Sequence, residues 1–195
     1  MDNPEEDQND RSIELMVRIG NGDMVAFEQL VDMHQHAVVG TVAKMLGNPS
    51  DAEDVAQQVF VRIWKSAARY TPQAKFTTWM YTITRNLVFN EVRRRQRKPS
   101  VSLDEREEEH HLSSSVDEGM RPDEETLQKE LEAAVDAAIQ ELPEKQRLAV
   151  ILRRYEDMPY EDIGEVLGLS LSAVKSLIFR ARGQLKENLQ KYLDS

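Results

Sequence analysis

The sequence contains no cysteine, few aromatic residues and no long apolar run. The absence of cysteine excludes disulfide bonds and thiolate metal sites. Aromatic residues make up 6% of the chain and hydrophobic residues 40%, which allows packed cores of modest size. No apolar stretch approaches the roughly 18 residues that a membrane span requires. The acidic start, MDNPEEDQND, lacks the basic and apolar parts of a signal peptide. These absences predict a soluble, cytoplasmic protein without membrane insertion.

Charge is distributed unevenly along the chain. The net charge of −10 argues against a nucleic-acid partner when it is taken alone. However, the segment RNLVFNEVRRRQRK at 85–98 carries six cationic residues against Glu91, and residues 175–191 are also basic. Between them lies the acidic stretch LDEREEEHHLSSSVDEGMRPDEE. Two basic patches on either side of an acidic segment keep nucleic-acid binding open.

Hydrophobic periodicity predicts helices almost throughout, with no convincing strand and no internal repeat. The helical segments cover 11–46 with a break at 20–22, then 48–70 and 77–98, and then several shorter stretches between 126 and 185. Asn48 or Ser50 can cap the second segment, since Pro49 suits a helix start. Residues 99–125 have no period and cannot bury enough apolar surface to fold alone. We therefore expect an all-α chain with a disordered N-terminus (1–9), two small helical domains (10–98 and 126–195) and a flexible acidic linker (99–125).

The stretch PYEDIGEVLGLSLSAVKSLIFRAR has the pattern of a helix-turn-helix, in which a second helix enters a DNA groove. Gly168 can take the left-handed conformation that ends the first helix, and Ser170 can cap the second. Gly164 has no side chain and allows another helix to approach closely. On a helical wheel, Val174, Leu177 and Ile178 share one side with Ala181 and Leu185.

The opposite side of this helix is cationic and polar but includes Phe179. Cationic side chains bind guanine edges or phosphates, serine binds either, and phenylalanine can touch a thymine methyl group. The alternative is that Phe179 packs on a neighbouring helix and the cations are only solvated. The predicted DNA-binding set, with one residue from the earlier segment PEKQRLAVILRRYED, is Arg153, Ser172, Lys175, Ser176, Phe179 and Arg180.

Two long segments together resemble a known family. LPEKQRLAVILRRYEDMPYEDIGEVLGLSLSAVKSLIFRARGQL resembles the C-terminal domain of bacterial RNA polymerase sigma factors of the extracytoplasmic-function type, and SDAEDVAQQVFVRIWKSAARYTPQAKFTTWMYTITRNLVFNEVRRRQRK resembles their other conserved domain. The resemblance implies that the first domain binds the polymerase clamp and the melted minus-ten promoter element. The second domain would bind the minus-thirty-five element and the polymerase flap. Promoter DNA, core RNA polymerase and an anti-sigma factor are the implied partners, although no segment identifies the last.

The resemblance also implies residue roles in the first domain. The polymerase-docking set is Asp54, Gln57, Gln58 and Trp64; the alternative is a solvated helix face plus one core tryptophan. Asn86 would lie by a pocket that captures a flipped base, with the loop 70–76 forming the rest of it. Asn86 could instead cap or bridge within its own domain. The predicted minus-ten set is Tyr70, Lys75, Asn86, Asn90, Arg93 and Arg94, while the neighbouring Arg95 and Arg97 would also meet phosphates.

Nothing in the sequence indicates catalysis. His34 and His36 are two apart on a helix and do not share a face, so they predict no metal site. There is no glycine-rich phosphate loop, nucleophile elbow or zinc-protease motif. We therefore expect no enzymatic activity, no cofactor and no small-molecule substrate. Two other classes remain: a stand-alone helix-turn-helix regulator, and an enzyme with an appended helix-turn-helix, such as a serine recombinase.

Overall fold

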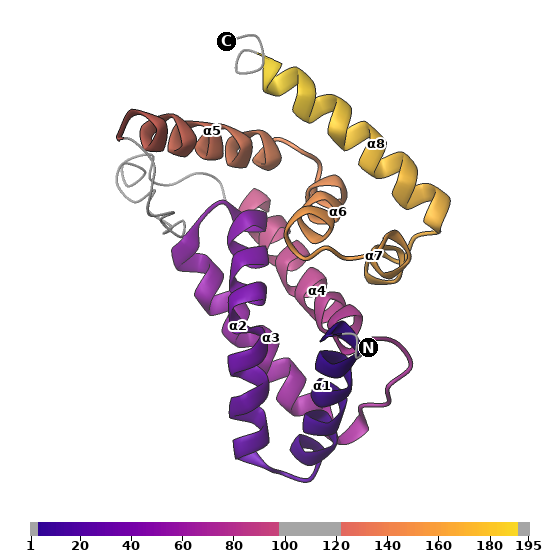
Figure 1. Cartoon of the computed structure of the whole chain (residues 1–195). Coiled ribbons are helices and arrows are strands. Elements are labelled where there is room, and N and C mark those ends of the chain that lie inside the picture. Colours follow the sequence, from indigo (N-terminus) through magenta and orange to yellow (C-terminus); the bar gives the residue numbers. More distant parts are fainter. Residues whose placement is uncertain (1–3, 98–121, 191–195) are drawn as a thin grey trace.

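The computed structural model describes the backbone of residues 4–97 and 122–190 and the side chains of 7–97 and 129–190. Within these ranges the chain forms helices joined by short turns, and no strand occurs (Figure 1). This confirms the all-α prediction. None of the described helices is both long and apolar enough to cross a membrane.

The first group of helices comprises α1 (Pro4–Gly20), α2 (Met24–Leu46), α3 (Pro49–Ser66), the short 3-10 helix η1 (Ala67–Arg69) and α4 (Phe76–Arg97). The turn after α1 contains Gly22 at a φ of 88°, and the carboxylate of Asp23 caps α2 by accepting from the N–H of Ala26. Asn48 caps α3 through the N–H of Ser50, with Pro49 as the first helical residue. Of the two predicted caps, Asn48 is the one used.

Residues 4–9, which were expected to be disordered, form the first turns of α1. The physical reason lies partly in Asn9, whose side-chain oxygen accepts a hydrogen bond of 2.9 Å from the N–H of Phe76. This bond satisfies an otherwise unpaired donor at the start of α4 and ties α1 to it. Behind it, Met16, Leu30 and Phe76 are fully buried in the core of this group.

The second group comprises α5 (Pro122–Gln140), α6 (Glu144–Tyr155), α7 (Tyr160–Leu167) and α8 (Leu171–Asn188). Helix α5 begins at Pro122, a few residues before the predicted boundary at 126. The remainder of the predicted acidic linker, 99–121, lies outside the described residues. Leu148, Ile151, Leu152 and Ile163 are fully buried in the core of this group.

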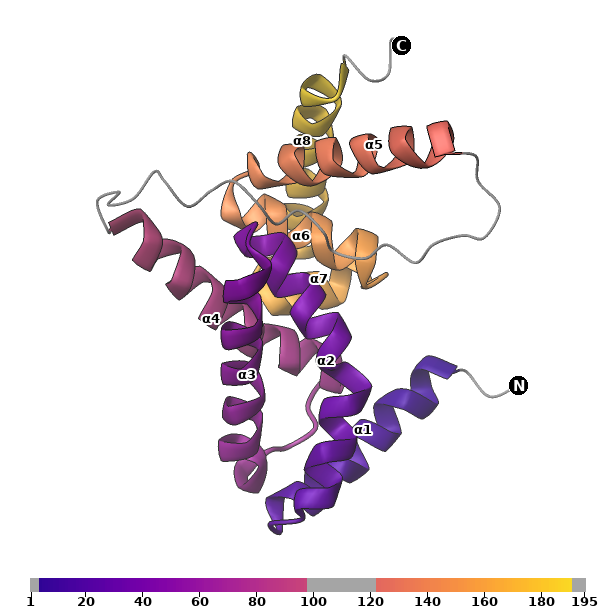
Figure 2. The ribbon, with the colours of Figure 1, turned by 90° about the vertical axis from the view of Figure 1, so that its left-hand side faces the viewer.

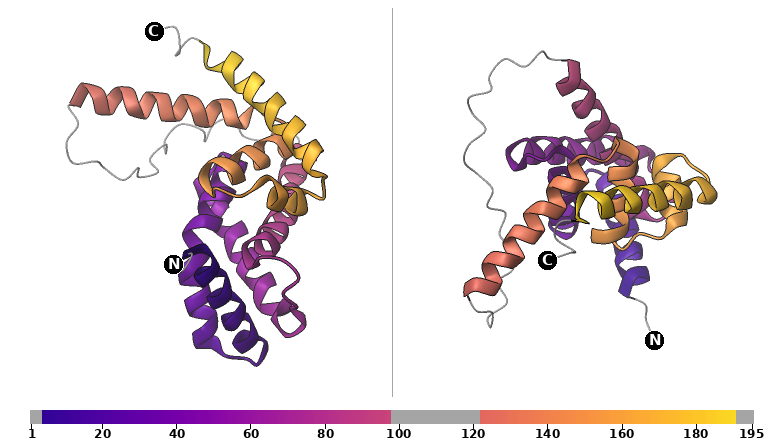
Figure 3. Two further views of the ribbon diagram at one scale, coloured as in Figure 1. Left: turned by 45° about the vertical axis from the view of Figure 1, so that its right-hand side comes forward. Right: turned by 90° about the horizontal axis from the view of Figure 1, so that it is seen from above.

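The two groups pack against each other, a relationship that the sequence pattern did not predict. Helix α7 crosses α4, and α6 lies against α2, so that α5–α8 cover one end of the first group (Figure 2). Helix α8 contacts α5, α6 and α7 and lies on the outer side of the second group (Figure 3). The polar contacts include a hydrogen bond of 3.1 Å from Thr41 to Glu156 and one of 2.7 Å from Arg147 to the carbonyl of Met45.

Candidate nucleic-acid interface

The turn between α7 and α8 has the geometry of a helix-turn-helix. Gly168 adopts φ 65° and ψ 42°, the left-handed conformation that ends α7. Ser170 caps α8 by accepting from the N–H of Ala173. A Cβ atom at Gly164 would lie 2.8 Å from the carbonyl oxygen of Leu169, so the close approach is made by the turn itself. These positions hold α8 at a fixed angle to α7.

Helix α8 has two distinct faces. Val174, Leu177, Ile178 and Ala181 are buried, as the helical wheel predicted. The predicted DNA-contacting residues on α8 are all exposed, and the Phe179 side chain is 78% exposed. Packing of Phe179 on a neighbouring helix, the alternative, does not occur among the described residues. The exposed residues of this face are Ser172, Lys175, Ser176, Phe179 and Arg180.

Local hydrogen bonds orient the polar groups on this face. The hydroxyl of Ser176 donates to the carbonyl of Ser172 (3.0 Å), and Nε of Arg180 donates to the carbonyl of Ser176 (3.3 Å). Arg153 lies elsewhere, at the end of α6. Its guanidinium donates to the carbonyl of Asp157 (3.1 Å) and lies over the ring of Tyr160. Arg153 therefore also stabilises the α6–α7 turn, where Asp157 has a positive φ of 47°.

A cavity of about 580 Å³ opens in the first group, between the end of α3, the loop 70–75 and α4. Tyr70 belongs to its wall, as predicted. Cationic side chains from the end of α3 and from η1 belong to its lining, and so does one residue of α7. The lining residues are Lys65, Ser66, Arg69, Tyr70, Thr71, Gln73, Ala74, Thr78, Trp79, Thr82, Ile83 and Glu165.

The wall of this cavity combines aromatic rings with unpaired hydroxyl groups. The ring centroids of Tyr70 and Trp79 are 4.8 Å apart in an edge-to-face arrangement, and both rings pack near Phe76. Burial raises the pKa of Tyr70. The Tyr70 hydroxyl and the Thr78 Oγ1 are buried without a hydrogen-bond partner within the described residues. Both oxygen atoms are covered from solvent, so a ligand in the cavity would meet them only after the surrounding side chains shift.

Neither predicted asparagine lines the cavity. Asn86 is exposed on α4 and its side-chain oxygen accepts two hydrogen bonds from Arg85, at 3.1 and 2.7 Å. This matches the alternative in which Asn86 bridges within its own domain. Asn90 is also exposed. The sequence analysis missed Thr78, Thr82 and Ile83, which also line the cavity. Thr82 and Ile83 follow Trp79 by three and four residues, so they lie on the same face of α4 as its ring.

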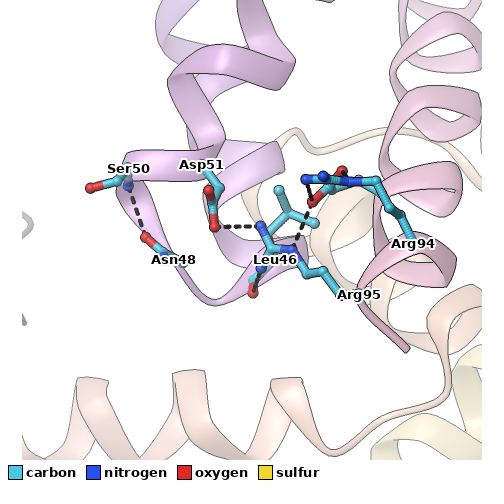
Figure 4. A network of polar contacts seen from close by, with 7 residues as sticks. Leu46, Asn48, Ser50, Asp51, Arg94 and Arg95 are labelled. Atoms are coloured by element: carbon cyan, nitrogen blue, oxygen red, sulfur yellow. Dashed lines mark hydrogen bonds and ion pairs between the residues drawn. The ribbon is translucent and has the colours of Figure 1, made fainter. Parts of the chain in front are cut away.

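The basic end of α4 is divided between structural and free cations. Arg95 donates to the carboxylate of Asp51 (2.6 Å) and to the carbonyl of Leu46, so it joins the end of α4 to the α2–α3 turn (Figure 4). Arg94 and Arg95 both pair with Glu91, and these hydrogen bonds lower the pKa of Glu91 to about 2. Arg93 is exposed. Lys75 pairs with Asp162 of α7 at 3.1 Å.

The predicted docking residues on α3 differ in exposure. Asp54, Gln57 and Gln58 are exposed, and the apolar Val61, one turn further on, is 49% exposed. Trp64 is half-buried and its ring packs edge to face on Phe27 at 5.1 Å. The structure thus places three of the four residues on an open surface, and Trp64 partly in the core.

The histidines take opposite positions, as their spacing implied. His34 is buried, and its Nε2 lies 2.9 Å from the hydroxyl of Ser12. Burial lowers the pKa of His34 to about 4. His36 is exposed. No group of three or more histidine or acidic side chains that could hold a metal ion occurs in the described part of the chain.

Two family models match this chain, one in each helical group. The family model of sigma-70 region 2 matches residues 30–98, which include the cavity, and that of sigma-70 region 4 matches 132–185, which include the helix-turn-helix. The RNA polymerase sigma-H factor of Pseudomonas aeruginosa is 34% identical, with 92% of this chain and 94% of that protein covered. The ECF RNA polymerase sigma factor SigW of Bacillus subtilis is 30% identical, with 91% and 99% covered.

Solved structures show the same fold. CnrH, determined in complex with the cytosolic domain of CnrY, superimposes with a TM-score of 0.68 at 25% identity, over 93% of this chain and 98% of that chain. The sigma factor RpoE of Bartonella quintana, determined with the anti-sigma factor NepR, gives a TM-score of 0.63 at 22% identity, over 84% and 96%. Both conserved sigma regions thus occur here in one chain, in order. The chain belongs to the extracytoplasmic-function (ECF) family of RNA polymerase sigma factors.

Proposed function

We propose that this sigma factor binds core RNA polymerase and directs initiation at promoters by reading DNA at two sites. Its exposed α8 face reads the minus-thirty-five element in the major groove, through Lys175, Phe179 and Arg180. The cavity beside α4 captures a base of the melted minus-ten strand. As a member of this family the chain acts in transcription initiation and not as an enzyme.

The observation that carries this proposal is the chemistry of the cavity. It has aromatic rings for stacking, two buried hydroxyls without partners, and the cations Lys65 and Arg69 at its side. A flipped base offers a flat ring and a polar pairing edge, while its backbone offers phosphates. Because a duplex keeps its bases stacked inside, the cavity suits single-stranded DNA.

The other interactions follow from this role. Asp54, Gln57 and Gln58 on the open face of α3 dock on the polymerase clamp, and the second group meets the flap. Arg93 and Arg94 at the end of α4 bind backbone phosphates, with Asn86 and Asn90 along the same helix. An anti-sigma factor is a further proposed partner. The RpoE structure was determined with the anti-sigma factor NepR, and the CnrH structure with the cytosolic domain of CnrY. Because this partner, core RNA polymerase, is soluble, a cytoplasmic location is part of the proposal.

Run-off transcription with purified core polymerase on genomic fragments tests the proposal. We expect transcripts from a small set of fragments only when this protein is added. A stand-alone helix-turn-helix regulator would bind DNA but would neither co-purify with core polymerase nor start transcription with it. The absence of both would contradict the proposed function.

A further inference from the structure

Helix α7 presents acidic and carbonyl oxygens to the strand-reading side of the first group. Asp162, in its first turn, forms an ion pair of 3.1 Å with Lys75 of the loop before α4. The Asp162 side chain is 20% exposed, so this pair is partly shielded from water. Lys75 is one of the cations proposed to meet the minus-ten strand. In this structure its charge is neutralised from within the chain.

The other end of α7 engages a second cation of α4. The guanidinium of Arg85 donates to the backbone carbonyl of Val166, in the last turn of α7. The C-terminal end of a helix carries partial negative charge, so it attracts a cation much as a phosphate does. Arg85 also holds the side-chain oxygen of Asn86. One contact with α7 therefore fixes two polar residues of the DNA-facing side of α4.

Between these two contacts, Glu165 forms part of the wall of the cavity. Among the lining residues it is the one from the second group, and Lys65, Arg69 and Trp79 are among the others. A carboxylate in this wall repels the phosphates of an entering strand. Helix α7 thus supplies three oxygen-bearing groups near cations that could otherwise bind phosphates: the Asp162 carboxylate, the Glu165 carboxylate and the Val166 carbonyl.

We propose that α7 is an internal competitor of the melted promoter strand, held in place by the contacts of Asp162 and of the Val166 carbonyl, with Glu165 in the wall of the base-capturing cavity. The proposal rests on the proposed function of the cavity. It implies that the free protein closes its strand-reading site, and that the two helical groups must separate before a base enters.

The same arrangement leaves the other proposed surfaces open. The outward face of α8 is exposed, and so are Asp54, Gln57 and Gln58 on α3. The closed protein can therefore meet the polymerase clamp and upstream duplex DNA while its cavity is covered. Strand capture would then be the step that waits for the separation of the groups.

Paired charge variants test this competition. Asp162→Asn with Glu165→Gln removes the ion pair with Lys75 and the carboxylate in the cavity wall. Glu161→Gln with Glu187→Gln removes the same charge from exposed residues of α7 and α8 that line neither described cavity. Because the chain has no cysteine, Glu53→Cys and Lys186→Cys allow specific spin labelling of one exposed site in each group. The distance between the labels reports separation of the groups without any DNA.

Binding is measured by anisotropy with a fluorescein-labelled, random-sequence single-stranded 12-mer, and with its duplex form as a control. We expect the contact variant to show longer label distances and roughly five- to tenfold tighter single-strand binding, with duplex binding unchanged. The charge-matched variant should keep the distances and affinities of the unaltered chain. An equal gain in both variants would reflect general electrostatics and would overturn the proposal.

Two further outcomes overturn it: label distances that stay the same in the contact variant, or longer distances without tighter single-strand binding. Failure of the proposed function is distinguishable, because it appears as absent run-off transcription with core polymerase for the unaltered chain and for every variant. Competition by α7 can therefore fail while sigma activity remains.

Discussion

Gly164 lies directly against the carbonyl oxygen of Leu169, at a distance that leaves no room for a side chain. An added Cβ would come within 2.8 Å of that oxygen, which belongs to the backbone of the helix-turn-helix turn. The N–H of Leu169 donates to the carbonyl of Gly164 at 2.8 Å, so the turn cannot move away without losing this bond. The angle between α7 and α8 thus depends on the absence of one methyl group.

The first prediction follows from this contact. Gly164→Ala should lower the free energy of unfolding by roughly 1–3 kcal/mol, because the overlap is with backbone. Gly183→Ala is the matched control, since a Cβ there meets nothing within 4 Å and alanine favours a helix by up to about 1 kcal/mol. Denaturant titration of both variants measures the difference. A stabilised Gly164→Ala protein would show that the turn can yield.

The second prediction concerns the exposed ring on α8. Phe179→Ala should weaken binding to duplex minus-thirty-five DNA while leaving the melting temperature nearly unchanged, because the ring is 78% exposed. Leu177→Ala, two residues away and buried, should instead lower the melting temperature through loss of core contacts. Melting curves and gel-shift titrations distinguish the two effects. A large drop in stability for Phe179→Ala would place this ring against another part of the protein.

The third prediction separates structural from DNA-binding arginines at the end of α4. Arg95→Ala should lower the free energy of unfolding by roughly 1–2 kcal/mol, since it removes charged hydrogen bonds to Asp51, Glu91 and the Leu46 carbonyl. Arg93→Ala should leave stability unchanged but should weaken DNA binding and reduce its salt dependence. Chemical denaturation and salt titrations provide the measurements. Equal stability of the two variants would rule out the joining role of Arg95.

The local features of the helix-turn-helix were predictable because local chemistry determines them. Gly168 and Ser170 act through their own backbone and neighbouring N–H groups, and the wheel of α8 follows from residue spacing. The cavity proposed to capture a base was predictable in part. Tyr70 was identified through the family resemblance, whereas Thr78 and Glu165 were not. Their roles depend on how distant segments pack, and hydrophobic spacing carries no information on that.

The same limit applies to charged residues. Arg93, Arg94 and Arg95 are alike in sequence, and only the position of the α2–α3 turn sets Arg95 apart. The packing of α7 on α4 is likewise invisible in the spacing of residues within either helix. It depends on contacts such as Lys75 with Asp162, between positions far apart in the chain.

The fourth prediction concerns acid sensitivity through His34. Its pKa is about 4 in the folded protein and about 6.5 when unfolded, because burial disfavours the charged ring. Below pH 6.5 the unfolded chain therefore binds a proton that the folded one does not. The contribution of His34 to the free energy of unfolding is therefore fully present above pH 6.5. It falls by about 3 kcal/mol as the pH is lowered towards 4.

Unfolding free energies measured between pH 7 and 4.5 check this. His34→Gln should flatten the dependence, while His36→Gln, at an exposed position, should retain it. Glu156, Asp157, Asp162 and Lys75 share a cavity of about 240 Å³ with His34, so comparison of the two variants isolates the imidazole. An unchanged slope in His34→Gln would assign the acid sensitivity to those neighbours.

The last prediction uses the two unpaired hydroxyls of the base-capturing cavity. Tyr70→Phe removes a hydroxyl and Thr78→Val replaces one with a methyl group, at buried positions where the hydroxyl has no partner within the described residues. Since a buried unpaired hydroxyl costs about 1–3 kcal/mol, neither change should reduce stability. Both should nevertheless reduce open-complex formation with core polymerase if a base that enters the cavity displaces the covering side chains and bonds to these hydroxyls. Permanganate reactivity of unpaired thymines near the start site measures this.

Thr84→Val provides the matched control. Thr84 is buried on the same helix, its hydroxyl donates to the carbonyl of Met80, and it does not line the cavity. Its loss should leave permanganate reactivity unchanged, and all three variants should bind upstream duplex DNA normally because that contact belongs to α8. Asn86→Ala in the same assay tests the asparagine that lies outside the cavity wall. Normal reactivity in both Tyr70→Phe and Thr78→Val would mean that these hydroxyls do not meet a base, and that capture depends on stacking alone.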